Sequence, residues 1–187
     1  MGIVTGAGDR RRTRLISGEE VAKSDPRIEA VGAIDELNSH MGLARAMAEK
    51  YGGRLSGQAR EMRELQLELF RMAGELCCAD ISKQGWVEPT SVRHVESIEA
   101  RIAALERSIE LPRSFIVPGA CDASAALDMA RAVARRLERH AVRMSEDGLY
   151  DNEQGLVYLN RLSDYLFLLA RAIEKAAGVP FSTKEGQ

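Results

Sequence analysis

The residues best suited to chemistry are a group of arginines between positions 131 and 139. Arg131, Arg135 and Arg139 repeat every four residues, and Arg136 and Glu138 lie between them. On an α-helix this spacing places the guanidinium groups near one another on one side. Crowded guanidinium groups repel each other unless an anion or carboxylates lie between them. The pattern therefore indicates either an anion-binding face or a solvated face with local Glu–Arg pairs, and charge alone does not decide between them.

A second candidate anion site is the loop in residues 1–25, where positions 5–14 read TGAGDRRRTR. Glycines let backbone N–H groups approach an anion, threonine hydroxyls donate to phosphate oxygens, and arginines neutralise the charge. The loop lacks the Gly-Lys-Ser/Thr of a Walker-type phosphate loop. It also lacks the third glycine of a dinucleotide fingerprint, since only Gly6 and Gly8 are present. A disordered basic arm is the alternative interpretation.

Further polar residues lie beside the apolar seams of two expected helices: Asp35, Asn38 and Gly42 on the first, and Asn160, Asp164, Phe167 and Arg171 on the last. An ionised aspartate near a bundle core needs a cation. We therefore expect Asp35 to pair with Arg131 or Arg135, within the chain or across a subunit contact. The alternative is an exposed Asp35 near the helix start, where the helix dipole favours it. Phe115 is an apolar loop residue that either plugs the end of the bundle or forms the wall of a pocket for a large flat ligand.

Apolar residues recur at helical spacing in five segments, with seams at 34–48, 62–76, 95–109, 127–144 and 159–176. Asp25 or Ser24 followed by Pro26 marks the first helix start, and Gly178 marks the last helix end. The breaks lie at 85–90 and 111–120. The pattern predicts an all-α, five-helix antiparallel bundle without strands or internal repeats. We expect one domain, with an N-terminal loop at 1–25, the bundle at 26–178 and a tail at 179–187 that is frayed from Ser182.

The composition narrows the range of functions. The chain has 187 residues, a formal net charge of −2 and 5% aromatic residues, which predicts neither nucleic-acid nor membrane binding. The chain shows no membrane span and no signal peptide at Met1, so we expect a cytoplasmic protein. The three cysteines have no metal-ligand spacing, and adjacent Cys77 and Cys78 are typical of small buried hydrophobic residues. Without a Glu-x-x-His motif, a metal site built from protein side chains is not expected.

Several separated motifs occur in one order: the loop at 5–14, KSDPR at 23–27, GAIDELN at 32–38, FIVPG at 115–119, ARAVARRLER at 130–139 and YLNRLSDYLF at 158–167. In these motifs the chain resembles the ATP:cob(I)alamin adenosyltransferases of the propanediol-utilisation type, from about Ile3 to Ala177. The resemblance implies a five-helix bundle that forms a homotrimer, with each active site between two subunits.

The resemblance also implies roles for individual residues. It assigns an ATP site to Thr5, Gly6, Gly8, Asp9, Thr13, Arg14 and Lys23 from the N-terminal side, and to Arg135, Arg136, Glu138, Arg139 and Asn160 from the last two helices. Asp35 matches an aspartate that pairs with Arg131 of a neighbouring subunit. Phe115 matches the phenylalanine that displaces the lower axial base of cobalamin, and Phe167 matches an aromatic residue of the corrin pocket. Asp35, Phe115, Arg131 and Arg135 are thereby the expected catalytic residues.

The implied substrates are ATP, which carries its own Mg²⁺, and cob(I)alamin, a nucleophile strong enough to need no general base. The implied partners are a flavoprotein reductase and an enzyme that accepts adenosylcobalamin. One departure concerns Arg11, which stands where the family usually has a glycine that can take a positive φ. We expect Arg11 either to weaken ATP binding or to supply charge together with its neighbours. A non-catalytic protein that holds ATP or cobalamin for delivery or sensing, and a purely structural bundle, are the alternatives.

Overall fold

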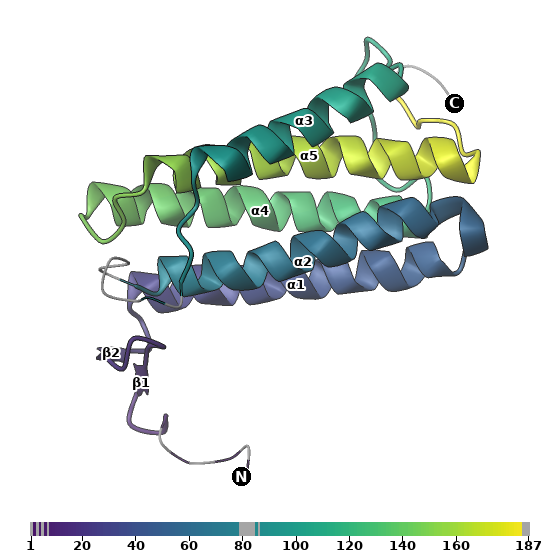
Figure 1. Cartoon of the computed structure of the whole chain (residues 1–187). Helices are drawn as coiled ribbons and strands as arrows, with labels where there is room; N and C mark the ends of the chain where they lie inside the picture. Colours follow the sequence, from purple (N-terminus) through teal and green to yellow (C-terminus); the bar gives the residue numbers. More distant parts are fainter. Residues whose placement is uncertain are drawn as a thin grey trace.

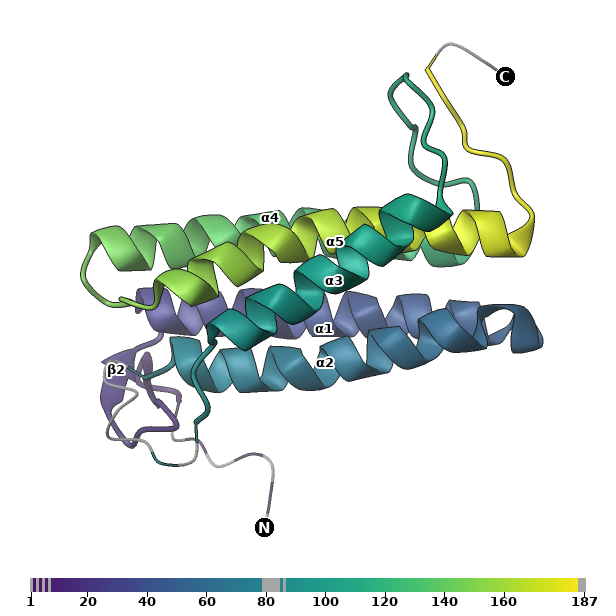
Figure 2. The same ribbon diagram turned by 45° about the horizontal axis from the view of Figure 1, so that its top comes forward.

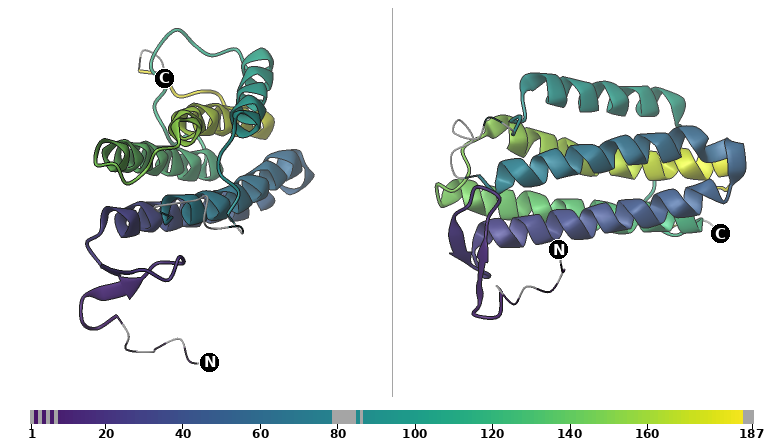
Figure 3. Two further views of the ribbon diagram at one scale, coloured as in Figure 1. Left: turned by 60° about the vertical axis from the view of Figure 1, so that its left-hand side comes forward. Right: turned by 60° about the horizontal axis from the view of Figure 1, so that its bottom comes forward.

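The computed structural model describes residues 2, 4, 6, 8–78, 85 and 87–184. Its elements are β1 (Arg12–Arg14), β2 (Glu20–Ala22), α1 (Pro26–Glu49), a 3-10 turn (Gly52–Leu55), α2 (Ser56–Leu76), α3 (Val92–Ser108), α4 (Asp122–Glu146) and α5 (Glu153–Ala177). Helix α1 packs on α2 and α4, while α5 packs on α4 and α3. Figures 1 and 3 show α1 beside α2 in one layer, α4 beside α5 in the next, and α3 on the outside. The predicted five-helix bundle is confirmed.

The apolar seams form one continuous core. All six residues of the seam expected at 127–144 are 0% exposed: Leu127, Ala130, Ala134, Leu137, Ala141 and Met144. Half of this seam is alanine, and α1 buries alanines at 30, 33, 44 and 48. Small side chains at a helix contact reduce the distance between the axes. Helix α4 is therefore held close to α1 and α5, and its long charged side chains lie at the borders of the seam.

The expected ends of the first and last helices are also confirmed. Asp25 caps α1, because its Oδ1 accepts a hydrogen bond from the backbone N–H of Arg27 at 2.9 Å, and Pro26 occupies the first turn. Gly178 ends α5 with φ of 74°. Among the described helices, none is both long and apolar enough to cross a membrane.

The N-terminal segment corrects one expectation, because β1 and β2 form a small antiparallel hairpin in which Thr13 lies opposite Val21. Leu15 and Val21 are buried with Cys77 in a cluster separate from the main core. Each strand has only three residues. Such short strands carry too little alternation to be recognised in a sequence. The expectation of a bundle without strands was wrong here.

Arg27 fastens this hairpin to α1. Its side chain is 6% exposed and donates to Glu19 Oε2 at 2.8 Å and to Asp25 Oδ2 at 2.9 Å. Hydrogen bonds from Arg27 lower the pKa of both carboxyl groups and raise the pKa of the guanidinium. The hairpin is therefore an ordered part of the fold and not a free basic arm.

The C-terminal segment corrects a second expectation. The backbone N–H of Val117 donates to Ser182 O at 2.7 Å, and the N–H of Lys184 donates to Phe115 O at 3.0 Å. Ile116 and Thr183 form a β-bridge between these bonds. Figure 2 shows the C-terminal segment rising beside the loop between α3 and α4. Residues 182–184 are thus paired and not frayed, while 185–187 lie outside the described residues.

A buried carboxylate fastens the opposite end of the bundle. Glu75 is 0% exposed and accepts hydrogen bonds from Thr90, Tyr150 and Asn152, at 2.6 Å from the two hydroxyls and 2.7 Å from the amide. Its partners belong to the segment before α3 and to the turn between α4 and α5. A Cβ on Gly155 would overlap the Tyr150 hydroxyl. This network fixes the end of α4 relative to the start of α5.

Candidate functional site

The hairpin encloses an open hollow of about 740 Å³. It is lined by four of the residues expected to bind ATP, together with two further arginines and a glutamate: Gly6, Gly8, Arg10, Arg12, Thr13, Arg14 and Glu20. Arg12 donates to Glu20 Oε1 at 2.6 Å and is thereby neutralised. In the described part of the chain, Arg10 and Arg14 have no ion-pair partner. The hollow therefore presents backbone, a hydroxyl and two free cationic groups, which suit an anion.

Lys23 lies against the glycine loop. Its backbone N–H donates to Arg11 O at 3.0 Å, and a Cβ on Gly8 would lie only 2.9 Å from its ammonium nitrogen. The N–H of Asp9 donates to Gly6 O at 3.2 Å and closes a turn there. The loop thus brings together Gly8 and Lys23, two of the residues to which the resemblance assigns an ATP site. Thr5 lies outside the described residues, so its expected role stays a prediction.

Arg11 adopts a backbone conformation that favours glycine. Its φ is 63°, and it is the only non-glycine residue with a positive φ in the ranges that the structure describes. A side chain in this region costs roughly 1–2 kcal/mol for an ordinary residue. The geometry explains why a glycine suits this position.

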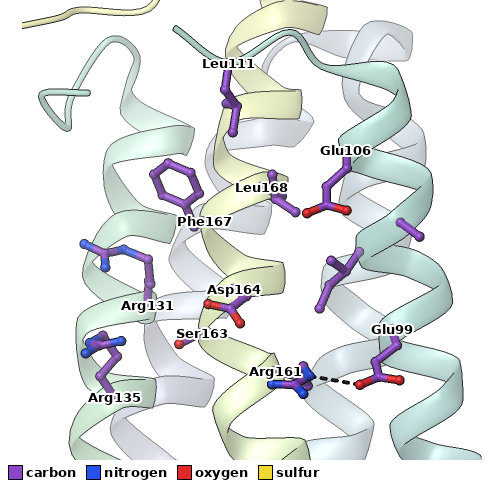
Figure 4. A pocket seen from close by; sticks show the side chains of 12 residues that line it. Glu99, Glu106, Leu111, Arg131, Arg135, Arg161, Ser163, Asp164, Phe167 and Leu168 are labelled. Carbon is purple, nitrogen blue, oxygen red and sulfur yellow. Dashed lines mark hydrogen bonds and ion pairs between the residues drawn. The ribbon is translucent and has the colours of Figure 1, made fainter. Parts of the chain in front are cut away.

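A cavity of about 510 Å³ lies between α3, α4 and α5 (Figure 4). It is lined by Glu99, Ile102, Ala103, Glu106, Leu111, Arg131, Arg135, Arg161, Ser163, Asp164, Phe167 and Leu168. Arg131 and Arg135 come from α4, whereas Phe167 comes from α5, so the fold gathers three expected site residues on one cavity. The lining groups of α3 were not found from the sequence, because their polar side chains resemble any solvated helix face.

The remaining α4 and α5 candidates fall into two groups. Asn160 Nδ2 donates to Glu138 Oε1 at 2.8 Å, and Arg136 pairs with Glu36 of α1. In contrast, Arg135 and Arg139 are exposed and have no ion pair among the described residues. These two arginines are therefore free to bind an anion.

The expected pairing of Asp35 is not found within this chain. Asp35 is exposed and makes no ion pair with any described residue. Arg131 instead lies near Asp128, with 3.6 Å between its Nε and Oδ1. The pairing across a subunit contact stays a prediction.

The hollow and the cavity are separate in one chain. The hollow is lined by residues between 6 and 20, and the cavity by residues between 99 and 168. Figure 1 shows the hairpin beyond the α1 side of the bundle, away from α3 and α5, and the loop that carries Phe115 at the opposite end. Phe115 is 83% exposed. The hairpin residues expected to bind ATP therefore do not share a cavity with Arg135 within a single subunit.

The family model described as cobalamin adenosyltransferase matches residues 3–173. The chain belongs to this family. It is 35% identical to the corrinoid adenosyltransferase of Bacillus subtilis over 96% of this chain and 90% of the relative. It is 35% identical to the PduO corrinoid adenosyltransferase of Salmonella typhimurium, over 95% of this chain and 51% of the relative. The chain thus spans about half the length of that relative.

Solved structures of the cobalamin adenosyltransferase family share the fold. One is a phenylalanine-to-alanine variant of the PduO-type ATP:corrinoid adenosyltransferase of Lactobacillus reuteri, complexed with cobalamin and ATP, with a TM-score of 0.87, 28% identity, and coverage of 99% of this chain and 100% of that chain. An arginine-to-lysine variant of that enzyme, complexed with ATP, has a TM-score of 0.87, 29% identity, and coverage of 98% and 100%. The resemblance seen in the motifs is confirmed.

Proposed function

We propose that the protein transfers the 5′-deoxyadenosyl group of ATP to the cobalt of cob(I)alamin, giving adenosylcobalamin and triphosphate. The observation that carries this proposal is the cavity on which Arg131 and Arg135 lie beside Phe167. Arginines suit a polyphosphate, and an aromatic ring suits the face of a corrin. The motifs around these residues are those of the family to which the chain belongs.

The reaction requires little from the protein except placement and charge. The electron pair of Co(I) forms a bond to the 5′ carbon of ATP, and the bond from that carbon to the triphosphate oxygen breaks. The triphosphate leaves with the electron pair of that bond, so no proton transfer and no general base are required. The side chains of Arg135 and Arg139, the hairpin arginines and Lys23 would stabilise the leaving charge, and Mg²⁺ would arrive with ATP.

Phe115 has a separate role in this proposal. It would exclude the lower axial base, which leaves Co(II) four-coordinate and easier to reduce before the transfer. Its ring is 83% exposed at the end of the bundle, although burial of an aromatic side chain is favourable. A large flat substrate would cover this ring.

We further propose a homotrimer in which the hollow of one subunit faces the exposed arginines of α4 in the next. The separation of the two groups within one chain supports this assembly, because neither group alone surrounds a nucleotide. Asp35 would then pair with Arg131 of the neighbouring subunit. The cytoplasmic location, the flavoprotein reductase that supplies Co(I), and the enzyme that accepts the product belong to the same proposal.

A binding protein for ATP or cobalamin, without turnover, is the second candidate function. The observation that favours it is Arg11, whose positive φ and bulk lie in the loop expected to approach phosphate. The two functions differ in product formation.

The test is an anaerobic assay with purified protein, chemically reduced cob(I)alamin and Mg·ATP, in which the cobalt–carbon product is followed by its visible absorption. We expect light-sensitive product over multiple turnovers. Arg135→Ala should lower kcat by about a hundredfold or more, because one charge contact to the leaving group is lost. Arg143→Ala, an exposed arginine two turns further along α4, is the matched control and should change little.

Absence of product from the unmodified protein would overturn the proposal. If ATP still raised Tm in that case, the binding function would replace it. Near-normal turnover of Arg135→Ala would remove Arg135 from the phosphate site.

A further inference from the structure

A buried cluster of charged side chains lies between α4 and α5, directly behind the cavity. Arg171 and Glu174 are 0% exposed, and Asp128 is 6% exposed. Arg171 Nη2 donates to Asp128 Oδ2 at 2.6 Å and to Glu174 Oε1 at 3.0 Å. Removing ions from water costs several kcal/mol for each ion unless they are well paired. Burying these three charged side chains therefore has a high desolvation cost. None of the three has a role in the proposed adenosyl transfer described above.

The cluster touches the cavity at two points. The guanidinium carbon of Arg171 lies 5.2 Å from the centroid of the Phe167 ring, which is within range of a cation–π contact. Asp128 uses its second oxygen, Oδ1, to approach Arg131 Nε at 3.6 Å. Phe167 and Arg131 both line the cavity. One buried pair, Arg171 with Asp128, therefore contacts a site residue on each of the two helices.

The charges of the cluster explain why Arg131 is drawn toward it. Arg171 carries one positive charge and faces two carboxyl groups, those of Asp128 and Glu174. Burial raises the pKa of the Glu174 carboxyl. Asp128 also attracts Arg131, whose side chain is 32% exposed. Because Asp128 is buried, this contact is less screened by water than a surface ion pair.

Arg131 faces Asp128 with the Nε edge of its guanidinium group, and not with its terminal nitrogens. A guanidinium group has five N–H donors in a rigid fork, one of them on Nε. The Nε edge faces Asp128 as an ion pair at 3.6 Å, which is too long for a hydrogen bond, and Nε is buried. This leaves both terminal nitrogens available to a ligand or to the carboxylate of another subunit. A lysine at this position has a single ammonium group, which could not face Asp128 and bind a ligand or a second carboxylate at the same time in this geometry.

We propose that Asp128 and Arg171 are positioning residues of the cavity: Arg171 fixes Asp128 and the Phe167 ring, and Asp128 holds Arg131 by its Nε edge. The structural part of this inference stands on the contacts alone, and only its kinetic consequence rests on the proposed adenosyl transfer.

The test compares Asp128→Asn with Glu174→Gln in the full-length protein. Glu174 bonds the same Arg171 but does not contact Arg131 in the described structure, and Gln keeps its size. The first measurement is the hydrogen-exchange rate of the Arg131 Nε–H group, observed by side-chain ¹⁵N NMR. We expect exchange to accelerate by about tenfold in Asp128→Asn and to stay near the original rate in Glu174→Gln, because only the first variant removes the negative charge that faces the Nε edge of Arg131.

The second measurement is a double-mutant cycle on kcat and KM. Asp128→Asn should lower kcat by about tenfold in the original background but have little further effect in Arg131→Ala, because residues that act together are not additive. Arg131→Lys leaves the buried pair intact and should reproduce the Asp128→Asn loss. It therefore keeps the test decisive if Asp128→Asn does not fold.

Unchanged Arg131 exchange in Asp128→Asn would overturn the positioning role, as would kinetic effects that add in the double variant. If Asp128→Asn and Glu174→Gln lowered kcat equally, the cluster would only stabilise the fold. If the unmodified protein makes no adenosylcobalamin, the proposed function fails, and the exchange measurement still decides the positioning role.

Discussion

Arg11 is a non-glycine residue in a backbone conformation that favours glycine. Its φ of 63° lies in the left-handed region, while its carbonyl accepts the bond from Lys23 that closes the hairpin. This bond joins the residue before β1 to the residue after β2, at the open end of the hairpin. The strain is therefore local and could be removed by one substitution.

We predict that Arg11→Gly raises the free energy of unfolding by about 1 kcal/mol relative to Arg10→Gly, since only the first relieves a positive φ. Both variants remove one positive charge from the same loop. Chemical denaturation measures the difference. The KM for ATP should stay the same or fall in Arg11→Gly. A collapse of ATP binding would instead identify Arg11 as a phosphate ligand.

At the scale of elements, the attachment of the hairpin to α1 depends on the guanidinium group of Arg27. Arg27 holds Glu19 from the hairpin and Asp25 from the start of α1, and its bonds lower the pKa of both carboxyl groups. A folded pKa below the ordinary value means that the unfolded segment binds more protons as the pH falls. This stabilisation is present above the ordinary carboxyl pKa and is lost as the pH falls through the folded value.

We predict that the hairpin opens in acid before the bundle unfolds. Amide exchange of Leu15 and Lys23, whose N–H groups bond within the hairpin, should accelerate below about pH 4. Asp25→Asn keeps a capping oxygen but removes one titrating group, so its exchange should be faster at neutral pH and depend less on pH. Asp151→Asn, in an exposed turn, is the control. Identical pH profiles for Asp25→Asn and the unmodified protein would contradict this account.

At the scale of the whole molecule, the expected site residues lie on surfaces that a single chain does not join. The hairpin, whose residues line the hollow, lies beyond α1 (Figure 3), while the cavity is lined by residues of α3, α4 and α5. Asp35 is exposed on α1. A head-to-tail ring of subunits would bring such unlike surfaces together at every contact.

We predict that two inactive variants restore activity when they are co-expressed. Lys23→Ala damages the hairpin side and Arg135→Ala damages the α4 side, so a mixed ring contains some contacts with both sides intact. In random mixtures about a quarter of the sites should be restored. Mixing the variants after separate purification, under conditions without subunit exchange, is the control. No recovery on co-expression would place the complete site within one subunit.

Much of the architecture followed from periodicity. The seams expected at 127–144 and 159–176 are buried, apart from the half-buried Ala176, because an apolar residue every three or four positions admits one buried face. Asp25, Pro26 and Gly178 act through local backbone geometry, so their roles could also be predicted. The hairpin and the paired C-terminal residues could not, because each depends on a partner distant in sequence or on strands of only three residues.

The sequence by itself determined the helical bundle, the family and the identity of most candidate residues, since these depend on local spacing and residue type. Only the tertiary structure decided which candidates share a cavity. It placed Arg131, Arg135 and Phe167 together, left Asp35 unpaired within the described chain, and revealed Asp128 and Arg171 behind the cavity. Burial and pairing of charges depend on which helices become neighbours, and helix spacing along one chain does not specify that arrangement.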